Sequence, residues 1–123
     1  MEAYYNLVMY YQDNDRPAKA IQEYKHIIEK LDSSYIYAYY NMGYIYLVYF
    51  QDYDEAIKYF DKVISLDHLY VEAYCNKGVC YEMLGKYKEA YIEFQTACQI
   101  HPNFELAIDG LNRIDKKTKT PIQ

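Results

Sequence analysis

The three histidines are the first candidates for catalysis or metal binding. They are His26, His68 and His101, separated by 42 and 33 residues. A pair of metal ligands on one helix needs histidines four residues apart with acidic neighbours, and the sequence contains no such pair. We therefore interpret these histidines as surface or exit-turn residues near helix ends, and we predict neither a metal site nor a cofactor.

The three cysteines could act as nucleophiles or form a disulfide. They are Cys75, Cys80 and Cys98, an odd count without a Cys-x-x-Cys pair, which does not indicate a disulfide framework. Cys75 and Cys80 lie five residues apart, so on one helix they point to different faces, and neither has a histidine at helical spacing to activate it. We expect buried, reduced thiols.

Charged groups at helix ends complete the search for chemistry. The pair Asp54-Glu55 falls in a predicted first helical turn, and a basic cluster of Arg113, Lys116, Lys117 and Lys119 falls at a predicted helix C-terminus. The helix dipole favours both placements without any catalytic role. The sequence has no glycine-rich phosphate loop. We predict that the protein is not an enzyme.

Composition narrows the class of protein. The chain has 123 residues, is 52% apolar and carries a net charge of −5, so it is long enough and apolar enough for one packed domain. The negative charge argues against a general affinity for nucleic acid. No run of 18 apolar residues is present, so we expect no membrane span and a soluble, cytoplasmic protein.

The elements that carry these residues repeat along the chain. The motif Ala-Tyr-x-Asn begins at Ala3, Ala38 and Ala73, at intervals of 35 residues. A second series, Ala-x-x-x-aromatic, follows each motif and begins at Ala20, Ala56 and Ala90. In both series apolar residues recur at spacings of three and four, so each unit predicts two amphipathic helices. One extra residue is present near Phe50, and the second helix of the first unit is one residue longer than its counterparts.

Local signals support these helices. Asp52-Tyr-Asp-Glu55 predicts a capping box, Pro17 is typical of a helix start, and Gly85 separates the third pair. Gly43 and Gly78 in the first helices leave room for aromatic residues such as Phe60 of the second helices, because a missing side chain lets helix backbones approach.

The period and these residues resemble the tetratricopeptide repeat family. The third unit matches the family pattern best, from Tyr74-Cys-Asn-Lys-Gly78 to Pro102. The second unit has His68 in place of the exit proline, and the first has Val8 in place of the glycine. The resemblance implies an all-α fold, a right-handed superhelical solenoid of antiparallel helix pairs.

We expect a single repeat domain over residues 1–116, with repeats at about 1–35, 36–70 and 71–104. A last amphipathic helix over 103–116, with Phe104 on its apolar side, would cap the solenoid, whose end must be closed by a helix with a polar outer face. Residues 117–123 would form a flexible tail.

In the resembling family the first helices line a concave groove. The groove-lining positions that we predict as a binding site are Tyr5, Asn6, Met9, Tyr37, Tyr40, Asn41, Tyr44, Val48, Asn76, Val79 and Met83. The other lining positions are Gln12, Asp13, Leu47, Glu72, Cys75 and Glu82. Asn6, Asn41 and Asn76 recur every 35 residues, and their amides could either bond the backbone of a peptide or order neighbouring side chains.

One subclass of the family holds the C-terminal carboxylate of heat-shock chaperones with a clamp of Lys, Asn, Asn, Lys and Arg. The matching positions here are Tyr5, Met9, Asn41, Glu72 and Asn76, and only Asn41 agrees. A register shifted by one repeat gives Tyr40, Tyr44, Asn76, Leu106 and Gly110, again with one agreement. We therefore do not expect a chaperone tail as the ligand.

The groove predicted from these residues is aromatic and aliphatic. Tyrosines with methionine nearby suit an apolar peptide or an amphipathic helix. Our hypothesis is therefore a protein-interaction module or scaffold. Two alternatives stay open: a structural module that forms a homo-oligomer through exposed tyrosines, and a partner-specific chaperone built from three such repeats.

Overall fold

The computed structural model describes residues 16–119, and these residues form helices and turns without a strand. The helices are α2 (Pro17–His26), α3 (Ile36–Ile45), α4 (Tyr53–Leu66), α5 (Val71–Met83), α6 (Tyr87–Ile100) and α7 (Glu105–Thr118). Two π-helical turns, η1 (Ile27–Leu31) and η2 (Tyr46–Phe50), continue α2 and α3. The fold is a right-handed superhelical solenoid, as predicted.

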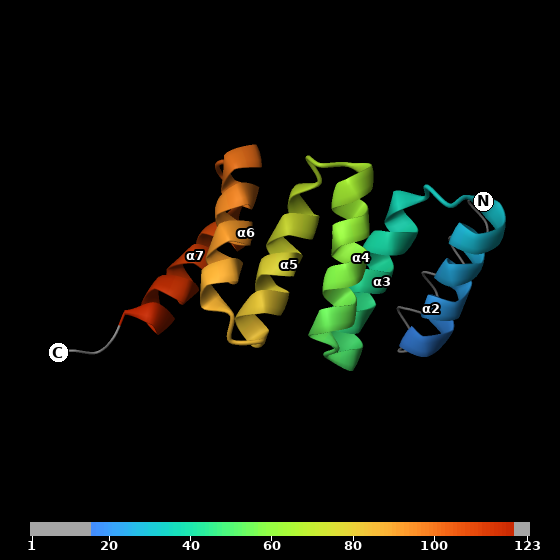
Figure 1. Ribbon diagram of the computed structural model, residues 1–123, viewed down its shortest axis with the longest axis horizontal. Coiled ribbons are helices and arrows are strands. Elements are labelled where there is room, and N and C mark those ends of the chain that lie inside the picture. Colours follow the sequence, from blue (N-terminus) through green and yellow to red (C-terminus); the bar gives the residue numbers. More distant parts are fainter. Residues whose placement is uncertain (1–15, 120–123) are drawn as a thin grey trace.

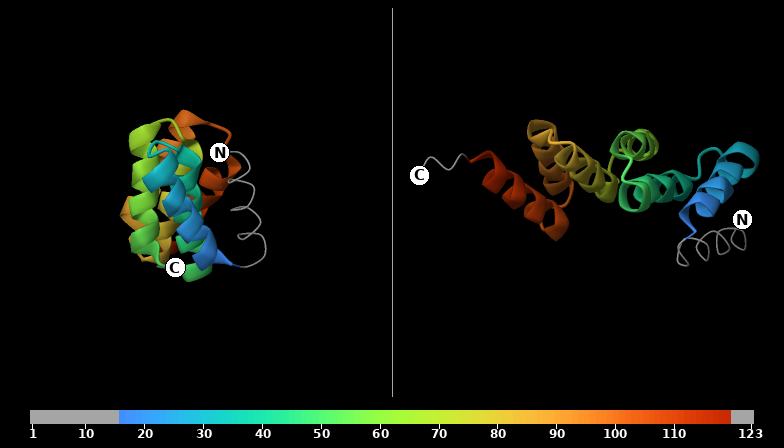
Figure 2. Two further views of the ribbon diagram at one scale, coloured as in Figure 1. Left: turned by 90° about the vertical axis from the view of Figure 1, so that its right-hand side faces the viewer. Right: turned by 90° about the horizontal axis from the view of Figure 1, so that it is seen from below.

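Successive helices run antiparallel and stand side by side along the long axis, with α2 and α7 at opposite ends (Figure 1). Seen along the helices, the chain zigzags between two layers, which gives the array its extended shape (Figure 2). The most extensive packing is between neighbours in the chain, and α5 also packs against α7. Each helix pair therefore relies on the next pair to cover its apolar face.

Small residues set the spacing between helices. A Cβ atom at Gly43 would lie 2.8 Å from a ring carbon of Phe60, and one at Gly78 would lie 2.8 Å from the ring of Phe94. Gly110 on α7 approaches the same residue, since its Cβ would lie 2.6 Å from the Phe94 ring. Both phenylalanines are fully buried. Phe94 thus holds α5 and α7 together through two glycines, whereas Phe60 has one.

The two extra residues of the repeat pattern are absorbed by π turns. In η1 the N–H of Asp32 bonds the carbonyl of Ile27, and in η2 the N–H of Gln51 bonds the carbonyl of Tyr46. These bonds span five residues instead of four, so each turn holds one more residue than an α-turn. Gln51 then adopts a left-handed conformation with φ 53°. The helices after each turn keep the spacing of the regular repeat.

Helix ends follow the predicted signals, with small shifts. The Asp52 side chain accepts a hydrogen bond from the Glu55 N–H at 3.2 Å, as a capping residue does. Gly85 has φ 77°, a conformation that favours glycine, and it ends the α5 segment. The last helix begins at Glu105 rather than at residue 103, and it includes Lys117 and Thr118, which the sequence pattern assigned to the tail.

Candidate functional site

A small depression lies where α3, α5 and the start of α7 meet. Its volume is about 120 Å³, and the residues that line it are Tyr40, Tyr44, Glu72, Cys75, Asn76, Phe104 and Leu106. Tyr40 and Tyr44 are four residues apart on α3, and Glu72, Cys75 and Asn76 occupy one face of α5. Helical spacing therefore brings five side chains from two repeats to one place.

Tyr40 is the most firmly held of these side chains. Its hydroxyl accepts a hydrogen bond from Asn76 Nδ2 at 2.8 Å, and its ring centroid lies 5.3 Å from that of Tyr70 and 5.8 Å from that of Phe60. Burial, and next the nearby Glu72 carboxylate, raise the pKa of Tyr40 to about 12. The hydroxyl is therefore protonated at neutral pH and presents a fixed polar group in an aromatic wall.

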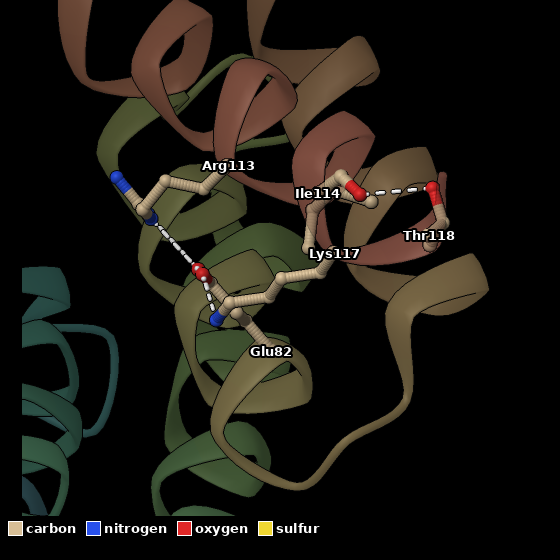
Figure 3. Close-up of polar contacts among 5 residues, drawn as sticks. All are labelled: Glu82, Arg113, Ile114, Lys117 and Thr118. Carbon is tan, nitrogen blue, oxygen red and sulfur yellow. Dashed lines mark hydrogen bonds and ion pairs between the residues drawn. The ribbon is translucent and has the colours of Figure 1, made fainter. Parts of the chain in front are cut away.

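A cluster of one buried carboxylate and two cations lies further along α5. Glu82 is only 6% exposed, and Arg113 of α7 grips it through Nε and Nη2, each at 2.9 Å (Figure 3). Lys117 adds a third bond, also at 2.9 Å (Figure 3). Burial raises the pKa of Glu82, but the hydrogen bonds from Arg113 and Lys117 outweigh it, so its pKa is lowered. This cluster fastens α7 to α5 and removes two cations from the basic group at the helix end.

The repeat pattern is matched by family models over most of the chain. A tetratricopeptide repeat model matches residues 71–104, and a second model of the same repeat matches residues 2–29 and 36–67. The chain belongs to the tetratricopeptide repeat family. A search among curated proteins found no match.

Solved structures of tetratricopeptide repeat domains are similar to this chain throughout. The second such domain of human RPAP3, determined in complex with an HSP70 peptide, is 27% identical with a TM-score of 0.83, and the match covers 91% of this chain and 92% of that one. The domain of Arabidopsis OM64 is 25% identical with a TM-score of 0.86 and 94% of both chains covered. MamA is 25% identical with a TM-score of 0.85, over 94% of this chain and 67% of MamA.

The predicted groove residues of this tetratricopeptide repeat domain fall into distinct settings. Tyr40, Tyr44 and Asn76 meet in the depression. Tyr37, Val48 and Met83 are exposed and do not line it. Val79 is half-buried and packs against the cores of the second and third helix pairs, beneath the surface. Asn41 is half-buried and does not line the depression, and Tyr5, Asn6 and Met9 lie outside the described residues.

Asn41 and Asn76, the members of the recurring asparagine series within the described residues, each bond a tyrosine hydroxyl. Asn41 Nδ2 donates to the Tyr24 hydroxyl at 3.0 Å, and Asn76 Nδ2 donates to the Tyr40 hydroxyl at 2.8 Å. Both bonds connect the first helix of one repeat to the preceding repeat. The amides thus order neighbouring side chains, which is one of the two roles that the sequence left open.

Two residues of the depression escaped the sequence reasoning as binding residues. Phe104 and Leu106 belong to the helix that the pattern identified as a cap, so they were assigned to the core face or to a mismatched clamp position. The signal that could have found them is the shifted register, which places Leu106 beside Tyr40, Tyr44 and Asn76. The last helix thus covers the third repeat and lines the depression at the same time.

The described residues offer little for catalysis. Burial raises the pKa of Cys75 to about 11 and that of Cys80 to about 12, so both thiols are protonated at neutral pH. His26, His68 and His101 are exposed. Within residues 16–119, no group of three His, Cys, Asp or Glu side chains could hold a metal ion. Within the same range, no helix is long and apolar enough to cross a membrane.

A second depression, of about 370 Å³, lies between α6 and α7. It is lined by Tyr87, Lys88, Tyr91, Ile92, Ile114, Asp115 and Thr118. It is larger than the first, but it contains none of the predicted groove residues. Tyr91, which lies in this second depression, is exposed to nearly the same degree as Tyr44.

Proposed function

We propose that this tetratricopeptide repeat domain is a protein-interaction module that holds an apolar peptide or an amphipathic helix in its concave groove. The observation that carries the proposal is the depression in which Tyr40, Tyr44, Phe104 and Leu106 form an apolar wall beside the amide of Asn76. Ligand sites of proteins are concave and apolar with a few placed polar groups, and this depression has that composition.

The comparisons support the same class of function. The RPAP3 domain, similar over nearly its whole length, was determined with a bound peptide. The groove described here lacks basic residues at the positions of the carboxylate clamp, so we propose a ligand that binds through apolar side chains rather than through a terminal carboxylate. We propose no catalytic role, because the thiols of Cys75 and Cys80 are buried and the histidines are far apart in the sequence.

The test compares two tyrosines of nearly equal exposure. Tyr44 is 38% exposed in the groove, and Tyr91 is 37% exposed on α6 outside it. Peptides selected from a random dodecapeptide phage library on the wild-type protein would be synthesised with a fluorophore, and their affinities measured by anisotropy. Tyr44→Ala should weaken binding about tenfold, as the loss of one aromatic anchor does.

The Tyr91→Ala variant should bind the same peptides with an affinity within about twofold of that of the wild type. The reason is that Tyr91 lies outside the groove and is not an anchor for the peptide. Circular dichroism of both variants checks that the helices are intact. Equal weakening by the two variants, or normal binding by Tyr44→Ala, would contradict the groove proposal.

Self-association is a second candidate, favoured by one observation. Val48, Tyr49 and Phe50 are three consecutive apolar residues in η2, and each is at least 40% exposed. Exposed apolar patches of this kind mark interaction sites. Analytical ultracentrifugation from low to high micromolar concentration separates the candidates, because a strict monomer removes self-association and leaves the groove proposal intact.

A further inference from the structure

The depression in the groove contains one charged residue. Of the seven lining residues, Tyr40, Tyr44 and Phe104 contribute aromatic rings, and Glu72 contributes a carboxylate. The helix α3 and the turn η2, which form one wall of the groove, contain no charged residue. A ligand group that enters the depression therefore meets aromatic surface and a negative charge, with no lining cation.

The two glutamates on the groove side of α5 differ in their partners. Glu82 is neutralised by Arg113 and Lys117 at 2.9 Å. Glu72 is exposed, and it has no lysine or arginine within ion-pair distance among residues 16–119. Glu72 raises the pKa of both Tyr40 and Cys75, so its field reaches the lining of the depression.

The nearest cation of α7 does not cancel this field. Arg113 lowers the pKa of Cys75. Its guanidinium, however, is held by Glu82 in a two-point ion pair and also interacts electrostatically with Asp109. The helix dipole explains why a glutamate is stable in the first turn of α5. The dipole is not a neutralising cation, however, so the Glu72 carboxylate can still pair with a positively charged group of a ligand.

From the geometry we infer that the depression receives a lysine or arginine side chain of the bound peptide. The aliphatic stem would cover Leu106, as the stems of long basic side chains cover apolar surface. The cation would lie among the rings of Tyr40, Tyr44 and Phe104 and within reach of Glu72, since cations are attracted to aromatic rings within about 6 Å. This inference rests on the proposed function and specifies its ligand: a mainly apolar peptide with one basic anchor.

The experiment selects the random dodecapeptide phage library separately on wild type, Glu72→Gln, Glu72→Lys and the control Glu105→Lys. Glu105 is a matched control, because it is also an exposed glutamate in a first helical turn but does not line the depression. Wild type and Glu105→Lys should enrich peptides with a lysine or arginine at one aligned position. Glu72→Gln should lose that enrichment, and Glu72→Lys should replace it with aspartate or glutamate.

A second measurement uses one enriched peptide and a copy in which the basic residue is replaced by methionine. The replacement should weaken binding to wild type about tenfold and weaken binding to Glu72→Gln by less, because Glu72→Gln has already lost the carboxylate that pairs with the basic residue. Enriched peptides without a basic position, or a basic position that survives in Glu72→Lys, would overturn the inference and leave the proposed function standing. Failure of every selection to enrich a peptide would overturn the proposed function itself.

Discussion

The helices α3 and α5 occupy the same place in successive repeats, but they are held by different forces. The segment Ile36–Phe50 has no charged side chain, and it packs through Ala38, Met42, Ile45 and its aromatic rings. The helix α5 carries three charges, of which two are paired: Lys77 lies 2.7 Å from Asp61 and 3.6 Å from Glu93, and Glu82 is held by α7. Repeat geometry thus fixes where a helix lies, whereas local chemistry decides what holds it.

The ends of the two helices differ for a related reason. Ala56 follows Ala38 by 18 positions, whereas Ala90 follows Ala73 by 17 positions. The longer segment ends in η2, which leaves Val48, Tyr49 and Phe50 exposed, while α5 ends in a tight turn at Gly85. The inserted residue therefore accompanies an exposed apolar surface at the end of this helix.

The largest expected effect concerns the phenylalanines that pack on the small residues of these helices. Phe60→Ala and Phe94→Ala should each lower the free energy of unfolding by about 3–5 kcal/mol, since both leave a cavity in the core. Phe94→Ala should cost more, because Phe94 contacts Gly78 and Gly110 on two helices, whereas Phe60 contacts Gly43. Urea denaturation followed by circular dichroism measures both values.

If an alanine variant does not fold, Phe60→Leu and Phe94→Leu give the same ranking at smaller cost. A larger loss at Phe60 than at Phe94 would show that the comparison between the repeats is wrong in this respect.

Glu82→Gln tests the electrostatic side of the comparison. The substitution removes charge-assisted hydrogen bonds from a buried site, which should cost about 2 kcal/mol at pH 7. The pKa of Glu82 is lowered from its ordinary value of 4.5, so the carboxylate stabilises the fold above that value. This contribution is lost as the pH falls through the lower pKa of the folded state.

The difference in unfolding free energy between wild type and Glu82→Gln should therefore be largest at neutral pH and shrink below pH 4.5. Glu89→Gln, at an exposed position of α6, is the control and should show no such change. A difference that is independent of pH would contradict the role of the Glu82 carboxylate.

The smallest expected effect comes from deleting one residue of η2, with the equivalent deletion in α5 as its comparison. Deletion of Tyr49 should convert η2 to an α-turn and change the free energy of unfolding by less than about 1 kcal/mol, as surface changes usually do. Deletion of Met83 from α5 should cost at least about 2 kcal/mol, since it moves Gly85 from the position that requires positive φ. Thermal melts of the two deletion variants compare their losses of stability directly. Equal losses would show that η2 tolerates the removal of a residue no better than α5 does.

Much of this fold could be predicted from the sequence, because repeated motifs reveal local periodicity. The helix pairs, the capping of α4 by Asp52 and the close approach at Gly43 and Gly78 all depend on residues within one repeat or on neighbouring repeats. The position of each extra residue was also visible, from the spacing of the alanines.

The polar contacts between distant residues could not be predicted. The hydrogen bonds of Glu82 join residues 31 and 35 positions apart, and no periodicity reveals that two cations of the last helix turn back toward α5. For the same reason Phe104 was identified as a core residue and not as part of the groove. Which tyrosine hydroxyl each asparagine bonds also depends on side-chain geometry, which a helical pattern does not specify.

The uncharged character of α3 and η2 has a consequence for the unfolded chain. Residues 35–50 form an unbroken segment without a charge or a proline, and seven of its residues are tyrosine. Segments rich in aromatic and β-branched residues with no charge are prone to form cross-β aggregates when exposed. In the native state helical packing hides its backbone, and Asp32 and Asp52 flank it as charged gatekeepers. The same stretch that supplies Tyr40 and Tyr44 to the depression is therefore a segment that favours aggregation if folding is slow.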